Sequence, residues 1–181
     1  MNSRRQFIGL SSIGILSSLF PLEGFSTDKS DFEGLVINED EGETLMIRNG
    51  DTTLRIKISK SHGSQSMSFL SESILPGEGI PVHKHLNEDE LIFIHKGSGL
   101  YTLGEKQYAV SEGAVVLVPK GVWHGLQNTG SVNIEMRFAY TPSGFEGYFR
   151  EVGTPPGQPF VVRTKEEKRI IAKKWGMIHK V

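Results

Sequence analysis

The chain has 181 residues, carries a formal net charge of −1 and contains no cysteine. This length is enough for one domain with a buried core, and the near-neutral charge gives no reason to expect nucleic acid as a partner. Because cysteine is absent, disulfides and thiolate ligands are excluded, and any bound metal must use nitrogen and oxygen ligands.

The first 26 residues combine a charged start with a short apolar stretch, a pattern typical of an export signal. Ser3, Arg4, Arg5 and Phe7 resemble the bacterial twin-arginine signal. This resemblance implies the twin-arginine export machinery as a partner and a periplasmic or extracellular location. An ordinary secretory signal, or an uncleaved anchor that tethers the protein to the membrane, remains the alternative.

A polar linker at 27–33 precedes a region of short apolar runs separated by turn signals such as Asn49-Gly50-Asp51 and Pro76-Gly77. Regular strand–turn spacing predicts an all-β sandwich or barrel. We expect this domain to cover residues 34–145. The runs that we interpret as strands are 33–37, 43–48, 52–58, 67–75, 90–96, 100–103, 107–110, 114–119, 123–128 and 133–140.

The last segment, residues 146–181, is expected to be an extension that contains a short α-helix. Thr164 followed by Glu167 three residues later forms a capping-box pattern at the start of this helix. Ile171 and Trp175 are four residues apart and give the helix a modest apolar face. We expect that face to dock on the β-domain, and the alternative is a contact in a dimer.

Histidines and an acidic run predict a metal site. His83 and His85 are two residues apart, so on a strand they share one face. Glu90 lies in the acidic run that follows, and His124 comes later, after a Pro–Gly turn. Three imidazoles and one carboxylate suit one divalent ion of Fe, Mn, Ni, Cu or Zn, and they leave one or two coordination positions open if the ion is five- or six-coordinate.

The remaining histidines are interpreted as structural or exposed. His62 lies in a Ser/Gly-rich region without a patterned partner, and His179 lies in the tail. His95 is out of phase with Glu90, Ile92 and Ile94 on its predicted strand. We therefore do not include these three histidines in the metal site.

The two histidine stretches resemble both halves of the cupin signature, and the resemblance covers about residues 34–145. The fixed positions of the signature are occupied by Gly77, His83, His85, Glu90, Gly97, Gly113, Pro119, Gly121, His124 and Asn128. The resemblance implies a double-sheet jelly roll in which His83, His85, Glu90 and His124 bind one divalent metal. Spacing and phase favour Glu90 over Glu88 and Asp89, and Asn128 is interpreted as a turn residue.

The sequence also resembles the single-domain bacterial branch often called quercetin-dioxygenase-like. That resemblance implies an exported dioxygenase-like oxidoreductase acting on a small aromatic or enolisable substrate, with Glu90 as a metal ligand or as a catalytic base. The alternatives are a non-catalytic module that binds a small molecule, and a metal-dependent isomerase or lyase. Cupins often pair through sheet edges, so a homodimer is also expected.

Overall fold

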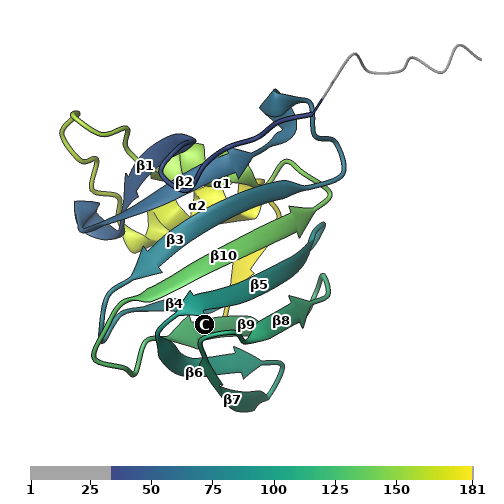
Figure 1. Cartoon of the computed structure of the whole chain (residues 1–181), viewed down its shortest axis with the longest axis vertical. Helices are drawn as coiled ribbons and strands as arrows, with labels where there is room; N and C mark the ends of the chain where they lie inside the picture. Colours follow the sequence, from purple (N-terminus) through teal and green to yellow (C-terminus); the bar gives the residue numbers. More distant parts are fainter. Residues whose placement is uncertain (1–33, 181) are drawn as a thin grey trace, which may run out of the picture. The chain divides into compact units, whose positions relative to one another are not determined.

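The protein folds into two antiparallel sheets, shown in Figure 1 from a computed structural model that describes residues 34–180. One sheet has six strands in the order β1-β2-β3-β10-β5-β8, and the other has five in the order β11-β4-β9-β6-β7. All neighbouring strands run antiparallel. The prediction of an all-β jelly roll is therefore confirmed.

The strands are short, as the turn-rich sequence predicts. They are β1 (Glu43–Ile47), β2 (Thr52–Ile58), β3 (Ser68–Ile74), β4 (Gly79–His85), β5 (Asp89–Lys96), β6 (Ser98–Leu103), β7 (Lys106–Ser111), β8 (Val115–Val118), β9 (His124–Gln127), β10 (Ile134–Thr141) and β11 (Met177–His179). The helices are the single turns η1 (Arg48–Gly50) and η2 (Lys60–His62), and the α-helices α1 (Glu146–Val152) and α2 (Lys165–Lys174).

The prediction of a first strand at 33–37 is wrong for residues 34–37, the part of it that the structure describes. Residues 34–37 form no strand, and the Val36 side chain is 87% exposed. β1 is the edge strand of its sheet and pairs with β2, and the described segment before β1 pairs with no strand of the sheet. There the Lys57 ammonium donates hydrogen bonds to the backbone carbonyls of Asn38, Glu39 and Glu41, which hold a turn. Apolar character alone therefore does not make a strand here.

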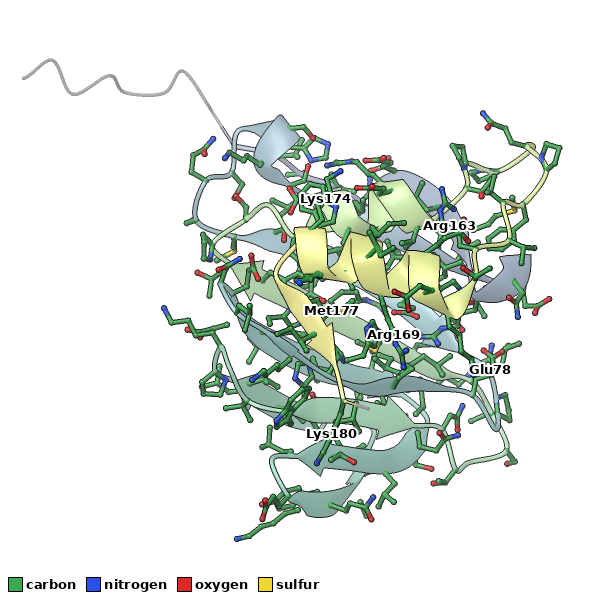
Figure 2. All side chains as sticks on the ribbon, turned by 180° about the vertical axis from the view of Figure 1, so that it is seen from behind. Glu78, Arg163, Arg169, Lys174, Met177 and Lys180 are labelled. Carbon is green, nitrogen blue, oxygen red and sulfur yellow. The ribbon has the colours of Figure 1, made fainter. Side chains whose placement is uncertain are left out.

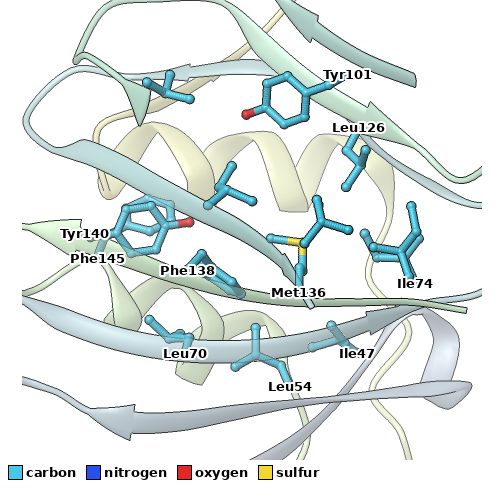
Figure 3. Close-up of a cluster of buried hydrophobic side chains, with 14 of the residues drawn as sticks. Ile47, Leu54, Leu70, Ile74, Tyr101, Leu126, Met136, Phe138, Tyr140 and Phe145 are labelled. Atoms are coloured by element: carbon cyan, nitrogen blue, oxygen red, sulfur yellow. The ribbon is translucent and has the colours of Figure 1, made fainter. Parts of the chain in front are cut away.

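The core lies between the two sheets and follows from residue alternation along the strands. Ile92 and Ile94 on β5 pair with Phe138 and Met136 on β10, and all four are buried. Figure 3 shows labelled core side chains from both sheets meeting in this space, including Leu126. Each such side chain contributes about 1.5–3 kcal/mol by leaving water. The predicted metal ligands are buried in the same space between the two sheets.

The C-terminal extension closes one side of this domain. The capping box predicted at the start of α2 is present, since Thr164 and Glu167 exchange hydrogen bonds. After Gly176, which has a φ of 74°, the chain continues as β11 and pairs with β4. Figure 2 shows α2 and β11 across this side of the molecule. The sequence does not predict α1 or β11.

Residues 1–26, the predicted export signal, and the linker at 27–33 lie outside the described residues. Within residues 34–180, no helix is long and apolar enough to cross a membrane.

Candidate metal centre

Three strands bring the predicted ligands together. His83 and His85 come from β4, His124 lies opposite His83 on β9, and Glu90 comes from β5 in the facing sheet. All four side chains are buried, and one donor atom from each lies within 4.8 Å of the others. Alternation on β4 and β5 turns these side chains into the space between the sheets. The structure therefore places the four sequence-predicted ligands in one cluster.

The closest approaches in the cluster all involve atoms that can bind a metal. His124 Nε2 lies 2.9 Å from Glu90 Oε2, and His85 Nε2 lies 3.6 Å from the same oxygen. His83 Nε2 and His85 Nε2 are 3.1 Å apart. Two ligands each about 2.1 Å from one ion and at right angles are roughly 3 Å apart. The separations therefore fit one shared ion.

Backbone carbonyls determine which imidazole nitrogens carry hydrogen. His83 Nδ1 lies 2.9 Å from the carbonyl oxygen of Pro81, and His124 Nδ1 lies 3.0 Å from that of Val122. A carbonyl can only accept, so each Nδ1 donates and each Nε2 keeps its lone pair. The lone pair of His124 Nε2 then faces Glu90 Oε2 at 2.9 Å, and that of His83 Nε2 faces the His85 ring at 3.1 Å, an arrangement that a cation between them stabilises. The donor set fits a divalent metal.

Burial also keeps two of the imidazoles neutral. Loss of hydration, reinforced by the neighbouring His124, lowers the pKa of His83 to about 3. The same loss of hydration, together with His83 and His124, lowers the pKa of His85 to about 2. Imidazole binds a metal in its neutral form. At neutral pH these side chains are therefore ready to act as ligands.

Aromatic side chains surround the cluster. The His85 ring packs edge-on against Phe145, with centroids 4.3 Å apart, and lies 5.0 Å from the Tyr140 ring. Burial raises the pKa of Tyr140 well above its usual value, and the charge of Glu90 and a hydrogen bond to it act in the same direction. Tyr140 therefore stays protonated, and its hydroxyl can donate to Glu90. The Tyr101 hydroxyl is buried, has no hydrogen-bond partner among the described residues and, like that of Tyr140, points into the space between the sheets (Figure 3).

A cavity of about 430 Å³ adjoins the cluster and reaches His83 and Glu90. Its wall is rich in aromatic side chains, namely Phe138, Tyr140, Phe145, Tyr148, Phe149 and Phe160. The charged pair of Arg48 and Glu72 also lines it. Cavities of this size and lining accept organic ligands of roughly one to three rings. Tyr148 and Phe149 belong to α1, so the extension contributes to the wall.

The neighbouring polar residues that are not predicted ligands mostly have structural roles. His95 is exposed, and Asp89 accepts a hydrogen bond from the backbone N–H of Lys120. His62 is hydrogen-bonded to Ser59. Asn128 is a turn residue, because its amide donates to the carbonyls of Ile74 and Val132 and accepts from the N–H of Gly130.

His179 differs from the interpretation based on sequence. The structure places it in the cavity wall, where β11 pairs with β4 and His179 lies opposite His83. Burial lowers its pKa, with a further contribution from the positive charge of Arg169. No motif or spacing in the sequence links residue 179 to residue 83, and only the strand pairing does so.

Comparison with known proteins agrees with this architecture. Residues 70–140 match the family model of the cupin domain. The crystal structure of a predicted oxalate decarboxylase from Thermotoga maritima superposes with a TM-score of 0.54 at 23% identity, covering 60% of this chain and 99% of that one. The fold is therefore the cupin jelly roll, and the buried histidine–glutamate cluster lies inside it.

Curated relatives match only part of the chain. The oxalate-binding protein of Thermotoga maritima is 26% identical over 108 residues, which are 56% of this chain and 89% of that protein. Gentisate 1,2-dioxygenase of a Ralstonia species is 31% identical over 91 residues, which are 46% of this chain and 25% of that enzyme. The chain spans 54% and 39% of the length of two further relatives, both uncharacterised proteins from Methanocaldococcus jannaschii and Bacillus subtilis.

Proposed function

We propose that this protein is a metal-dependent oxidoreductase of the cupin family, dioxygenase-like, that acts on a small aromatic or enolisable substrate. The observation that carries the proposal is the opening of the buried four-ligand cluster onto a cavity of about 430 Å³ with an aromatic wall. An aromatic ring can pack there against rings such as Phe138 and Phe149, with its oxygens directed to the cluster. The relative named gentisate 1,2-dioxygenase supports this choice of substrate class.

The residues have distinct roles in this proposal. His83, His85, His124 and Glu90 hold the ion, which when bound lowers the pKa of a substrate hydroxyl or enol and keeps the substrate in place. The carbonyls of Pro81 and Val122 keep the imidazole lone pairs directed inward. Glu90 is also positioned to take the hydroxyl proton of the substrate, and Tyr140 can stabilise the carboxylate through its hydrogen bond.

Arg48 is less available to an anionic substrate than its place in the wall suggests. Its Nε donates to Glu72 at 2.8 Å, and its Nη1 donates to the carbonyl of Gly79 at 2.8 Å. The charge of Arg48 is therefore compensated within the protein. This favours an aromatic substrate over a small dianion.

A non-catalytic binding protein is the second candidate, because one relative is named an oxalate-binding protein. Oxalate has only six non-hydrogen atoms, so it would fill a small part of the 430 Å³ cavity. The size of the cavity therefore makes this candidate weaker if oxalate is the ligand. A metal-dependent isomerase or lyase would use the same cluster without oxygen.

The test begins with elemental analysis of the full chain purified without a histidine tag or added metal. Oxygen uptake is then measured with catechols and flavonols, and His124→Ala serves as the variant with an incomplete cluster. About one iron, manganese, nickel or copper per chain, with oxygen uptake that this variant lacks, supports the proposal. Zinc without oxygen uptake favours the binding protein or the isomerase. No bound metal, even after reconstitution, overturns the proposal.

We also propose that the protein is exported through the twin-arginine pathway to the periplasm. The support is the Arg4-Arg5 pair ahead of a short apolar stretch. Replacing both arginines by lysine is expected to keep the protein in the cytoplasmic fraction, while the wild-type chain reaches the periplasm. Equal periplasmic amounts of both chains would overturn this assignment.

A homodimer is proposed on the resemblance alone, and light scattering of the purified chain tests it. A monomer mass at micromolar concentration would exclude it.

A further inference from the structure

The last strand brings a fourth histidine to the cluster. β11 pairs antiparallel with β4, so that Met177 lies opposite His85 and His179 opposite His83. Residues directly opposite each other in such a pair project to the same face of the sheet. Because His83 and His85 face the interior, His179 does too, and its ring centroid lies 6.2 Å from that of His83.

The backbone holds His179 firmly at this place. The N–H of Lys180 donates to the carbonyl of Val82 at 2.8 Å, and the N–H of Leu86 donates to the carbonyl of Gly176 at 2.8 Å. These bonds fix both ends of β11; Figure 2 labels Met177, the first residue of β11, and Lys180, which follows its last residue. The position of His179 in the cavity wall is therefore set by the sheet and not by a free tail.

The imidazole of His179 has an unused hydrogen-bonding atom. Its Nδ1 is buried and has no partner among the described residues. No free surface is left at Nδ1, whereas the ring as a whole is only partly buried and lines the cavity, so a polar ligand group there can bond to the other ring nitrogen, Nε2.

The other charged groups in the wall are less suited to the same role. Arg48 and Glu72 satisfy each other. Glu78 has a buried oxygen without a partner, but it lies just before β4 and five residues ahead of His83, or roughly 16 Å along an extended chain. Lys168 also lines the cavity, but it lies on α2, whereas His179 lies on the strand that pairs with β4 and directly opposite His83.

We propose that His179 is a specificity-determining residue that hydrogen-bonds a polar substituent of the ligand held at the metal centre. It selects aromatic ligands that carry a further hydroxyl or carboxylate next to their metal-binding oxygens. The inference rests on the proposed function in one respect, namely that an aromatic ligand binds in this cavity.

Two probes that differ by one hydroxyl test the selection. Catechol has two neighbouring hydroxyls, and pyrogallol has a third beside them. Affinities of both for the metal-loaded full chain are measured by calorimetry without oxygen. We expect the wild-type chain to prefer pyrogallol. His179→Phe keeps an aromatic ring but no nitrogen, and it should weaken pyrogallol binding by about 5- to 10-fold while catechol binding stays the same.

Two further variants and one measurement separate a binding role from a structural one. His179→Gln restores a polar atom close to the position of Nε2 and should recover part of the preference. His95→Gln changes an exposed histidine and should leave both affinities unchanged. Metal content should equal the wild-type value in every variant. If His179→Phe does not fold, the smaller His179→Leu gives the same comparison.

The outcomes distinguish this inference from the function on which it rests. If the wild-type chain binds neither probe, the proposed function fails. If the wild-type chain binds both probes equally, or if His179→Phe weakens both to the same degree or neither, the role of His179 is overturned while the proposed function stands. Only a loss of affinity confined to pyrogallol supports the selection by His179.

Discussion

Replacing Arg48 by methionine removes the cation that compensates a buried carboxylate. Arg48 Nε donates to Glu72 Oε1 at 2.8 Å, and a second N–H of the same guanidinium also donates to that oxygen. The Glu72 side chain is 4% exposed and that of Arg48 is 19% exposed. Burial raises the pKa of Glu72, and the charge of Arg48 opposes this increase. In Arg48→Met the carboxylate stays buried without its partner.

The expected loss of stability follows from this geometry. Removing one partner of a buried ion pair typically costs 3–5 kcal/mol. Because Arg48 is partly solvated, we expect about 2–4 kcal/mol at pH 7.5, or roughly 5–15 °C in Tm. Arg48 has a φ of 49°, in the left-handed region. Methionine is strained there to a similar extent, so the backbone contributes little to the difference.

The loss should depend on pH with a definite sign. Without Arg48, the pKa of Glu72 in the folded state lies further above its value in the unfolded chain. The folded state then binds the proton more readily, so acidification stabilises it relative to the unfolded state. The destabilisation is therefore complete above the pKa of the folded state, and it diminishes as pH falls through that pKa toward the unfolded value.

Urea denaturation at pH 7.5 and pH 5 measures both effects. The matched control is the double variant Arg48→Met with Glu72→Gln, which removes the charge and keeps the shape. It should recover most of the lost stability and show less dependence on pH than the single variant. A single variant within 1 kcal/mol of the wild-type chain, or a double variant no more stable than the single one, would refute the reasoning.

Three further predictions concern the cluster and its supports. His83→Ala and His124→Ala should each lose most of the bound metal in elemental analysis and keep the far-ultraviolet circular dichroism of the folded barrel; unchanged metal content in both would contradict the assigned site. Tyr101→Phe should raise the free energy of unfolding by about 1 kcal/mol, since the hydroxyl is buried without a partner. A free energy of unfolding below that of the wild-type chain would mean that the hydroxyl has a hydrogen-bond partner. Gly147→Ala should cost about 1–3 kcal/mol in urea denaturation, because a Cβ there overlaps the Trp175 ring. Unchanged stability would show that this ring can move aside.

His83, His85 and Glu90 could be predicted because their signals are local, whereas the resemblance to the cupin signature is what joins His124 to them. The spacing of His83 and His85 fixes a shared face on a strand, and the phase of Glu90 with Ile92 and Ile94 separates it from Asp89, whereas Glu88 is set aside by the spacing of the cupin signature. These relations hold whatever the neighbouring strands do. The structure places all of these side chains between the two sheets.

β11 could not be predicted for the opposite reason. A strand of three residues, Met177–His179, is too short to show alternation, and its apolar content is ordinary. Its register depends on how α2 docks and on the turn at Gly176, which the local sequence does not encode. The helix itself is predicted, because its capping box is a local signal. The sequence therefore reveals the helix but not the strand that the helix positions.

The site has two parts, one that the sequence predicts and one that it does not. The predicted metal ligands lie inside residues 70–140, the segment that matches the cupin domain, whereas Tyr148, Phe149 and His179 lie outside it. If the proposed function is correct, the matching segment supplies the shared metal chemistry and the extension supplies much of the surface that meets the ligand. Relatives that share only the matching segment can then keep the metal and differ in ligand. The choice of ligand should therefore be sought first in the extension.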